Sequence, residues 1–253
     1  MYAAERLQLI VQRARRDGRV DVAGLASELD VTPETVRRDL TTLERQGTLR
    51  RVHGGAIPVE RLRFEPSLTV RDALMQAEKE RIAKAALEEV PDGGAVLLDA
   101  GTTTARLAEM LPTDRGLTVV TNALPIAVSV SSLPNVTVFM VGGRIRGRTL
   151  AAADEWAVRS LEDTCVDVAF LGTNGVSAER GLTTPDVAEA AVKRAMLASA
   201  RRRVVLADHT KFGSDHFARF GRLQDVDVVV SDTGLDEETA DAIEALGPRV
   251  VRA

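Results

Sequence analysis

The chain has 253 residues and a formal net charge of −4, and 45% of its residues are apolar. This is the composition of an ordinary globular protein with enough apolar residues for one small and one larger core. No apolar run approaches about 18 residues, and the N-terminus lacks a basic segment followed by an apolar one. We therefore expect a soluble, cytoplasmic protein and exclude a membrane span.

The negative net charge argues by itself against a nucleic-acid binder, but the charge is unevenly distributed. Residues 1–57 contain ten Arg and eight Asp or Glu, a net charge of +2, so the remaining 23 basic and 29 acidic residues give −6. A basic N-terminal segment on an acidic chain is what a protein needs if that segment meets phosphate groups.

The N-terminal segment has the spacing of a helix-turn-helix. Helices are predicted over residues 5–16 and 22–29, and a turn of about three residues leads to a third helix that Thr32 caps. Pro33 suits the first turn of this third helix, and Gly47 suits its end.

The third helix has an apolar face and a basic face. At about 100° per residue, its apolar side chains fall in one stripe and its polar side chains occupy the opposite arc. The stripe comprises Val36, Leu40 and Leu43, and the opposite arc comprises Glu34, Arg37, Arg38, Thr41 and Arg45. An ordinary amphipathic surface helix has the same pattern. The helix-turn-helix context therefore favours a helix that enters a DNA groove.

A short alternating segment follows and predicts a winged variant of the motif. Residues 49–55 read LRRVHGG, which alternates like a hairpin and ends in paired glycines. Wings of this kind lie against phosphates or in the minor groove.

These motifs resemble the deoxyribose-operon repressor (DeoR) family. The resemblance rests on VTPETVRRDL at residues 31–40, on Gly47, and on LRRVHGGA at residues 49–56. It implies a bacterial winged helix-turn-helix repressor whose larger C-terminal domain senses a phosphorylated sugar. The predicted DNA-binding residues are Thr32, Thr35, Arg37, Arg38, Arg45, Arg50, Arg51, His53 and Gly54.

After a predicted DNA-binding domain at residues 1–57 and a linker at 58–76, residues 77–253 alternate between strand and helix patterns. Strands are predicted at residues 95–99, 117–121, 136–141, 166–171, 203–207, 226–231 and 249–252, and helices at 77–90, 103–111, 125–133, 154–161, 187–200 and 237–246. Between 171 and 187 we expect a loop rich in Gly and Thr. The strands are short and β-branched, so the predicted fold is α/β, with a winged helix-turn-helix followed by a Rossmann-like parallel sheet covered on both faces. Cys165, the single cysteine, begins an apolar run and is expected to be buried and reduced.

Polar residues follow several of these strands, where a parallel sheet binds its ligands. The first set, DAGTTT at residues 99–104, combines a glycine turn with three hydroxyls at the start of a helix, which suits an anion. Threonine is also a common N-cap, so this set alone is weak evidence. Similar sets occur at residues 121–122, 142–144, 172–175 and 208–212. Together they suit a phosphorylated polyol.

The same segments resemble the sensor domain of the family, which is similar in fold to ribose-5-phosphate isomerase and glucosamine-6-phosphate deaminase. Two departures are residues 150–154 (LAAAD), where the family often has a glycine, and Asn174, where many relatives have an acidic residue. The predicted effector-binding residues are Asp99, Gly101, Thr102, Thr103, Thr104, Asn122, Gly142, Gly143, Arg144, Asn174, Glu189, Asp208 and Lys211. Lys211 could instead be an ordinary solvated surface lysine.

The alternative function is a sugar-phosphate isomerase or deaminase with an appended DNA-binding domain. Such chemistry needs a base beside the substrate carbon and a second proton-transferring group. Acidic residues that could serve are Asp99, Glu189 and Asp208, whereas Asn174 cannot. His and Cys do not occur at metal-ligand spacing, and a dinucleotide fingerprint is missing, so we expect no metal, no cofactor and no catalytic residue.

We therefore predict a DNA-binding transcriptional regulator of repressor type for a carbohydrate uptake or catabolism operon, controlled by a phosphorylated sugar. By resemblance, fructose-derived phosphates are among the candidate effectors. The expected partners are double-stranded operator DNA, a phosphorylated sugar and further copies of the chain in a dimer or tetramer. The sugar, the operator sequence and the direction of the response are left open by the sequence.

Overall fold

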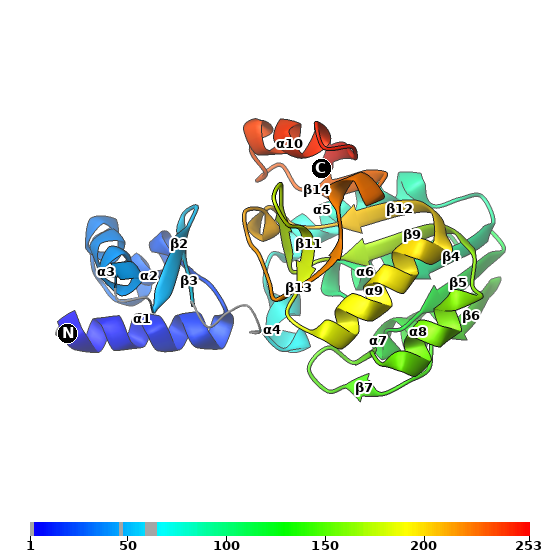
Figure 1. Cartoon of the computed structure of the whole chain (residues 1–253), viewed down its shortest axis with the longest axis horizontal. Coiled ribbons are helices and arrows are strands. Elements are labelled where there is room, and N and C mark those ends of the chain that lie inside the picture. The colour runs from blue at the N-terminus through cyan, green and yellow to red at the C-terminus, as the bar shows by residue number, and fades with distance from the viewer. Residues whose placement is uncertain (1–2, 46–47, 59–64) are drawn as a thin grey trace. The chain divides into compact units, whose positions relative to one another are not determined.

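The computed structural model describes residues 3–45, 48–58 and 65–253. The chain divides into two compact units, Met1–Pro66 and Ser67–Ala253, which are coloured along the chain in Figure 1. The predicted helix end at Gly47 and residues 59–64 of the predicted linker lie outside the described residues. Among the residues that are described, no helix is long and apolar enough to cross a membrane.

The N-terminal unit is a three-helix core with a small antiparallel sheet, in strand order β1-β3-β2. Its elements are α1 (Ala3–Asp17), β1 (Val20–Asp21), α2 (Val22–Glu28), α3 (Pro33–Arg45), β2 (Leu49–Val52) and β3 (Gly55–Pro58). The predicted apolar stripe of α3 is buried, with Val36 and Leu40 at 0% exposure and Leu43 at 3%. The winged helix-turn-helix predicted from the sequence is confirmed.

Helix α3 is also fixed by two polar features. The Thr32 Oγ1 accepts a hydrogen bond from the Thr35 backbone N–H at 3.2 Å, which is the expected N-cap. In addition, the Asp39 carboxylate is buried and paired with Arg6 of α1, with Nε–Oδ2 at 2.5 Å and Nη2–Oδ1 at 3.1 Å. This bidentate pair was not predicted from the sequence, and it joins α1 to α3 in the unit's interior.

The second unit is a seven-stranded sheet in the order β15-β14-β12-β9-β4-β5-β6, with two smaller antiparallel sheets. Its helices are α4 (Leu68–Ala73), α5 (Gln76–Ala86), α6 (Thr102–Glu109), α7 (Leu124–Val130), α8 (Glu155–Glu162), α9 (Val187–Ser199) and α10 (Glu237–Glu244). The main strands are β4 (Gly94–Leu98), β5 (Leu117–Thr121), β6 (Val136–Met140), β9 (Val166–Gly172), β12 (Ala200–Leu206), β14 (Val228–Ser231) and β15 (Arg249–Arg252). Every adjacent pair in the main sheet is parallel.

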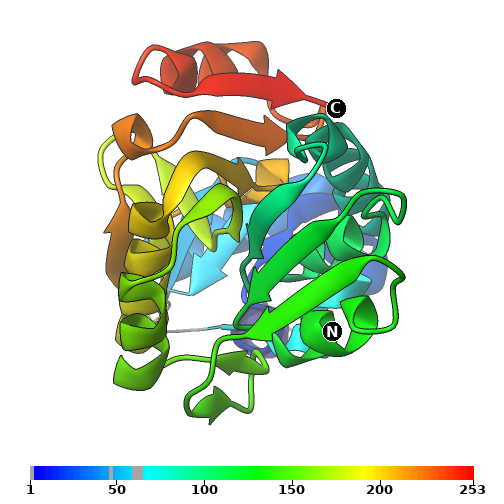
Figure 2. The same cartoon turned by 90° about the vertical axis from the view of Figure 1, so that its right-hand side faces the viewer.

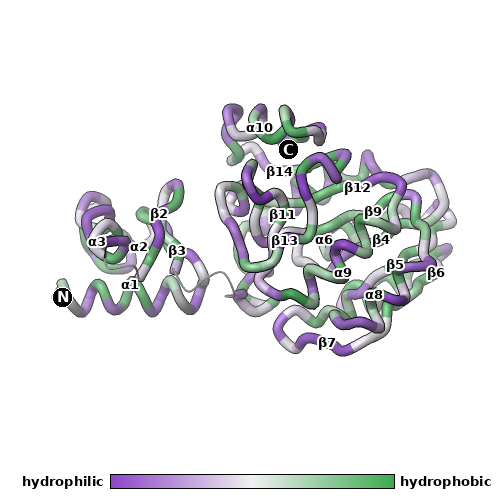
Figure 3. Tube along the Cα trace, in the orientation of Figure 1, coloured by the Kyte–Doolittle hydropathy of each residue, from purple (hydrophilic) through white to green (hydrophobic). Residues whose placement is uncertain are grey.

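Figure 2 shows this sheet from β15, in red, to β6, in bright green. Alternate residues of each strand point to opposite faces, so the sheet has two hydrophobic cores. In β4, Val96 and Leu98 join the core under α5, α6 and α7, whereas Leu97 joins the core under α8 and α9. Strands β4 and β9 are accordingly hydrophobic along most of their length (Figure 3). The predicted parallel sheet with both faces covered is confirmed.

Two predictions about local structure are wrong. The expected loop between 171 and 187 contains a hairpin, β10 (Gly175–Ser177) and β11 (Gly181–Thr184), which pairs with β13 (Ala218–Gly221). A second small hairpin comprises β7 (Ile145–Arg146) and β8 (Ala151–Ala152). Cys165 is exposed rather than buried, because β9 begins only at the next residue. The strands of the two hairpins were missed because all four are too short, and β10 and β11 also contain Gly or Thr, so none produces a period-2 apolar pattern.

Candidate nucleic-acid interface and ligand site

The exposed face of α3 presents two adjacent arginines. Arg37 lies 3.3 Å from Glu34, an exposed pair one turn apart, and its side chain remains 53% exposed. Arg38 is exposed and has no ion-pair partner in the part of the chain that the structure describes. Exposed pairs of this kind are weak, so both guanidinium groups are available to an external anion.

The hairpin β2–β3 is fastened to the helices beside it. The Arg51 backbone N–H donates to Glu44 of α3 at 2.9 Å, and its guanidinium donates to the Thr41 hydroxyl at 3.4 Å. At the turn, the Gly54 carbonyl accepts from the Val22 N–H at 2.9 Å, and Gly54 has a positive φ of 72° that favours glycine. The wing is therefore held in a fixed orientation relative to α3.

The other predicted DNA-binding residues lie on the same two elements. The Thr32 and Thr35 hydroxyls bond to each other at 2.9 Å at the start of α3, so they also cap the helix. The exposed side chains Arg45, Arg50 and His53 come from the end of α3, from β2 and from the hairpin turn. All nine predicted residues thus belong to α3 or to the β2–β3 hairpin and its flanks.

In the main sheet of the second unit, the chain runs from β4 outward to β5 and β6, then returns to β9 on the other side of β4 and continues outward to β12, β14 and β15, so the strand order reverses between β4 and β9. Ligands of open α/β sheets bind at this point, beyond the carboxyl ends of the strands. Asp99, directly after β4, accepts from the Gly172 N–H at the end of β9 at 3.0 Å and from the buried Lys193 ammonium. Lys193 also donates to the Gly172 carbonyl at 2.9 Å.

Burial dominates the electrostatics of this pair. It raises the pKa of Asp99, while the Lys193 ammonium acts in the opposite direction. Both side chains are almost completely buried, at 1% exposure for Asp99 and 5% for Lys193. The Asp99–Lys193 pair therefore ties the two central strands to α9, a structural task that differs from the effector contact predicted for Asp99.

The turn after Asp99 opens α6 without a side-chain cap. Gly101 is its N-cap residue, and the Thr104 hydroxyl is used internally, donating to the Asp99 carbonyl at 2.7 Å. In the described chain, the hydroxyls of Thr102 and Thr103 have no hydrogen-bond partner. The start of α6 therefore keeps N–H groups, two hydroxyls and the positive end of the helix dipole for a ligand.

Asn122 supports this turn from the next strand. Its Oδ1 accepts from the Ala100 N–H at 3.0 Å, and its Nδ2 donates to the Ala152 carbonyl at 3.1 Å. With both ends of the amide occupied, Asn122 positions the glycine turn against β8.

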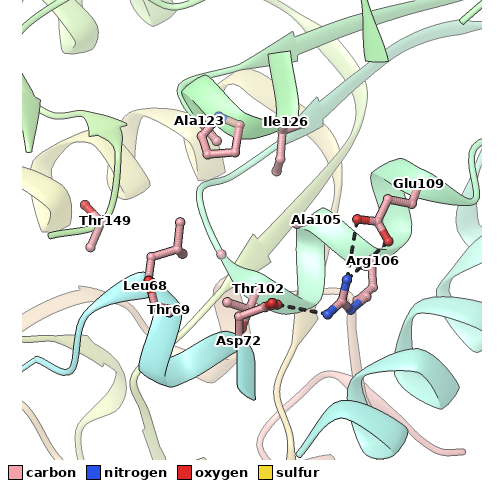
Figure 4. A pocket seen from close by; sticks show the side chains of 12 residues that line it. Leu68, Thr69, Asp72, Thr102, Ala105, Arg106, Glu109, Ala123, Ile126 and Thr149 are labelled. Carbon is pink, nitrogen blue, oxygen red and sulfur yellow. Dashed lines mark hydrogen bonds and ion pairs between the residues drawn. The ribbon is translucent and has the colours of Figure 1, made fainter. Parts of the chain in front are cut away.

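A cavity of about 310 Å³ lies beside the start of α6. Figure 4 shows Leu68, Thr69 and Asp72 of α4 on one side and Thr102, Ala105 and Arg106 of α6 beside them. The Arg106 guanidinium is 3.0 Å from the Asp72 carboxylate and 3.3 Å from Glu109. The cavity is lined by Leu68, Thr69, Asp72, Gly101, Thr102, Ala105, Arg106, Glu109, Ala123, Pro125, Ile126 and Thr149. Of the predicted effector residues, Gly101 and Thr102 line it.

Glu189 is connected to the cavity through Thr149. The Thr149 hydroxyl donates to the Glu189 carboxylate at 2.7 Å, and the Arg146 guanidinium forms an ion pair with the same carboxylate. Arg146 also lies 3.3 Å from Asp186. Glu189 is buried, so this pair neutralises its charge inside the protein.

Asp208 and Lys211 follow the end of β12 and are not among the residues that line the described cavity. The Lys211 Nζ is 3.8 Å from the Asp208 carboxylate, and the Thr210 N–H donates to that carboxylate at 3.1 Å. Burial alone would raise the pKa of Asp208, but Lys211, Thr210 and Lys79 together hold it below its ordinary value. The structure thus groups Lys211 with Asp208 rather than with the Gly101 turn.

Lys79 of α5 is buried next to this group. Its amino group donates to the carbonyls of Arg71 and Leu74, at and just beyond the end of α4. Burial lowers the pKa of Lys79 to about 8, with Asp208 acting against this shift and Lys211 adding to it.

The remaining predicted residues have other neighbours. The Arg144 N–H donates to the Asp154 carboxylate at 2.9 Å, so the loop with Gly142 and Gly143 packs at the start of α8. Asn174 accepts from the Thr184 hydroxyl at 3.0 Å in the β10–β11 hairpin. None of these residues lines the described cavity.

The structure adds site residues that sequence reasoning did not select: Arg106, Asp72, Thr149 and Arg146. One signal was present for Arg106, because it follows Thr102 by four positions and so lies on the same face of the predicted helix. In the described residues, no group of three His, Cys, Asp or Glu side chains is placed to hold a metal ion.

Two comparisons bear on identity. Residues 75–233 match the DeoR C terminal sensor domain, and residues 6–61 match the DeoR-like helix-turn-helix domain. The chain belongs to the DeoR family of transcriptional regulators. Such a regulator acts by binding DNA, and the two matched domains correspond to the two compact units.

Relatives of this DeoR-family protein match over nearly the whole chain. It is 37% identical over 252 residues to the HTH-type transcriptional regulator GlpR of Haloferax volcanii, with 99% of this chain and 98% of the relative covered. It is 33% identical to FruR of Bacillus subtilis, named as an uncharacterized HTH-type transcriptional regulator, with 92% of each covered. It is 30% identical to the glycerol-3-phosphate regulon repressor of Escherichia coli, again with 92% of each covered.

Among solved structures, ribose 5-phosphate isomerase A from Neisseria gonorrhoeae matches 58% of this chain and 56% of its own, at 17% identity and a TM-score of 0.41. The fold assignment rests instead on the strand order and parallel register described above.

Proposed function

We propose that this regulator is a repressor whose DNA binding responds to a phosphorylated sugar bound in the second unit. It would act in the cytoplasm on an operon for carbohydrate uptake or catabolism, as a dimer or tetramer. The observation that carries the proposal is the position of the cavity, which joins the uncapped start of α6 to α4, the first element after the linker. A relative is named as a glycerol-3-phosphate regulon repressor, which supports a phosphorylated effector.

The start of α6 supports recognition of the phosphate. Free N–H groups at a helix start favour an anion through hydrogen bonds and through the helix dipole. The hydroxyls of Thr102 and Thr103 add two further donors. The rest of the cavity combines apolar side chains, such as Leu68 and Ile126, with the Thr69 and Thr149 hydroxyls. This mixture suits a polyol whose carbon skeleton and hydroxyl groups must both be accommodated.

Helix α4 supports a route from the effector to the DNA-binding unit. It forms one wall of the cavity, and it is held by the Asp72–Arg106 pair and by a hydrogen bond from the Leu68 N–H to the Arg148 carbonyl at 3.0 Å. A ligand that contacts α4 in one of its positions better than in another shifts the population toward that position. Because the linker precedes α4, this shift would alter how the DNA-binding units are presented to the operator.

The test combines a ligand screen with a DNA titration. Thermal-shift measurements on the full chain, with phosphorylated sugars and their unphosphorylated counterparts, identify the effector. Fluorescence anisotropy with an operator fragment, at fixed salt, then measures DNA affinity with and without that compound. We expect stabilisation by a phosphorylated sugar only, fructose-derived phosphates being among the first to test, and a change in operator affinity. If no phosphorylated sugar both stabilises the protein and alters its operator affinity, the proposal is wrong.

The alternative function, sugar-phosphate isomerisation or deamination, is less well supported. A general base must not be held in an ion pair, and its pKa must lie close to neutral pH so that it can accept a proton. Each candidate carboxylate is instead engaged by a basic side chain: Asp99 by Lys193, Glu189 by Arg146 and Asp208 by Lys211. We expect no turnover of any bound sugar phosphate. Catalysis above buffer in a coupled assay, abolished by Glu189→Gln, would favour the enzyme instead.

A further inference from the structure

One stretch of the chain has no charged side chain over 28 residues. It runs from residue 116 to residue 143 in a sequence that is 28% charged, and it ends at Arg115 on one side and Arg144 on the other. It contains β5, α7 and β6. Interior strands such as β5 explain part of this pattern, because they are buried on both faces. Helix α7 and strand β6 require another explanation, since they lie at an edge of the sheet.

This edge exposes large apolar side chains. Of the twelve large apolar side chains that are exposed in the described chain, five lie between residues 124 and 145. Val128 of α7 is 66% exposed and Phe139 of β6 is 59% exposed. The other three are Leu124, Met140 and Ile145. Val136 and Val138 pack with α7 in one core, so by strand alternation Phe139 lies on the other face of β6. Exposed apolar side chains therefore flank this edge on both faces of the sheet, which marks the edge as an interaction surface.

The backbone of β6 is also available for pairing. Asn135 and Val141, which flank the strand, bond to β5 through the Leu117 N–H and the Thr121 carbonyl. Because backbone groups alternate along a parallel strand, Val136, Val138 and Met140 direct theirs away from β5. An unguarded edge of this kind is a template for another strand.

The opposite edge of the same sheet is guarded. Strand β15 begins with Arg249 and ends with Arg252, and these side chains pair with Glu89 and Glu237. Charges on an edge strand discourage pairing with another chain. The two edges, visible at opposite ends of the sheet in Figure 2, therefore differ in whether charged side chains oppose the addition of another strand.

We propose that α7 and β6 form the contact between two copies of this chain, related by a two-fold axis, with the two β6 strands side by side and antiparallel. The uncharged surface is complementary to itself, and it offers no charge to a charged partner. A contact of β6 with the β15 edge of another copy would place arginines next to an uncharged surface. Such a head-to-tail contact would also add further copies without forming a closed assembly. The two-fold contact closes after two copies. The proposal does not depend on the effector or on the operator.

Substitutions that introduce a charge into the contact test it. We expect Phe139→Glu and Val128→Glu, each made in the full chain, to raise the dimer dissociation constant at least tenfold in sedimentation equilibrium. Leu246→Glu is the matched control, because Leu246 is exposed to 41% and lies beyond the contact, after α10. Both altered side chains are exposed in the single copy, so the folded chain should be retained, which circular dichroism and the thermal midpoint verify. Val128→Glu keeps the test valid if Phe139→Glu does not fold.

Several results would overturn the proposal. It is wrong if the parent is a monomer at all micromolar concentrations, or if both glutamate variants associate like the parent. It is also wrong if the variants keep the parent's mass but change its sedimentation coefficient, because the occupant of the surface would then be the chain's own DNA-binding unit. Mass is measured here without ligand or DNA, so a failure of this contact is distinct from a failure of the proposed effector response.

Discussion

The exposed face of α3 and the interior of the sensor unit use basic side chains in opposite ways. On α3, Arg37 and Arg38 stand at the surface, one with a single exposed partner and the other with none among the described residues. In the sensor unit, Lys193 and Arg146 are paired with buried carboxylates, and Lys79 is buried against backbone carbonyls. The exposed face of α3 keeps its charge available for an external polyanion, although the interior of its unit contains the buried Arg6–Asp39 pair. The interior of the sensor unit uses charge to hold the fold together, so hydroxyl groups and a helix start are left to bind its anion.

The difference has an energetic basis. An exposed ion pair contributes about 0–1 kcal/mol and releases its partners easily. A buried pair has already lost its hydration, so removing one partner leaves a charge that neither water nor protein compensates. We therefore expect substitutions in the sensor's buried pairs to act on stability, and substitutions of the exposed Arg37 and Arg38 to act on DNA binding.

The largest expected effect follows from removing the lysine of the central pair. Lys193→Met should lower the free energy of unfolding of the sensor unit by about 3–5 kcal/mol, because Asp99 would remain buried without its cation. Urea unfolding followed by circular dichroism measures this loss. The double variant Asp99→Asn with Lys193→Met is the control and should recover most of the stability. If Lys193→Met has nearly the parent's stability and alters only effector affinity, the pair belongs to the ligand site and the comparison fails.

The next effect concerns the anion itself. Thr102→Val removes a hydroxyl at nearly constant volume, and we expect it to weaken binding of the phosphorylated sugar by about 1.5–3 kcal/mol, with operator binding in the absence of the sugar unchanged. Isothermal titration calorimetry with the sugar identified by the thermal-shift screen measures the loss. The sequence assigns the same role to Lys211, and Lys211→Ala should have an effect of the same size if its ammonium turns from Asp208 to the phosphate.

These two variants separate the possible sources of anion affinity. If only Thr102→Val loses affinity for the sugar, the sensor recognises the phosphate mainly through uncharged donors, unlike α3, whose exposed arginines face the DNA. If only Lys211→Ala loses affinity, the sensor instead binds its anion through a cation, as α3 is expected to do. If both variants bind the sugar like the parent, the effector occupies another site.

How far the sequence predicts these features depends on the range of the interaction. The stripe of α3 and the β-branched strands of the sheet were predicted because each is a local pattern that burial preserves. The Arg6–Asp39 pair spans 33 positions and the Asp99–Lys193 pair spans 94. No local pattern encodes such partners, so the bonds from the Asp99 carboxylate to β9 and α9 were not predicted, and its contact with the effector stays a prediction.

Glycines limited the prediction in a different way. A Cβ on Gly175 would lie 2.2 Å from the Ser214 carbonyl oxygen, so glycine permits β10 to approach the backbone of the segment that precedes β13. In the sequence the same residue indicates a turn. Helix α4 was likewise assigned to the linker, whereas the second unit begins at Ser67 and includes it. Its contribution to the cavity could be recognised only once the fold placed it beside α6.

On α3, the expected effect is on DNA affinity. Arg38→Ala should weaken binding to the specific operator by about 1–3 kcal/mol if its guanidinium meets a guanine edge, without a change in the thermal midpoint. Arg51→Ala in the wing should instead weaken binding to all sequences and reduce the slope of affinity against salt, because phosphate contacts carry little sequence information. Anisotropy titrations at several salt concentrations, with operator and scrambled DNA, measure both. Unchanged operator affinity in Arg37→Ala and in Arg38→Ala would contradict the assignment of α3 as the reading helix.

The smallest expected effect concerns Lys79, a buried cation that donates to backbone carbonyls. Its pKa is lowered from 10.5 to about 8 by burial, while Asp208 and Asp72 raise it and Lys211 and Arg71 lower it. Above pH 8 the unfolded chain binds more protons at this residue than the folded chain does, so the free energy of unfolding rises with pH in this window. Between pH 7 and pH 9 the rise should be about 1 kcal/mol. Lys79→Met cannot titrate, and the difference between parent and variant isolates this contribution from other groups. Urea unfolding of both proteins across this range measures the rise. A parent that gains no stability over the variant would mean that burial does not lower the pKa of Lys79 and that the side chain stays charged in the folded sensor.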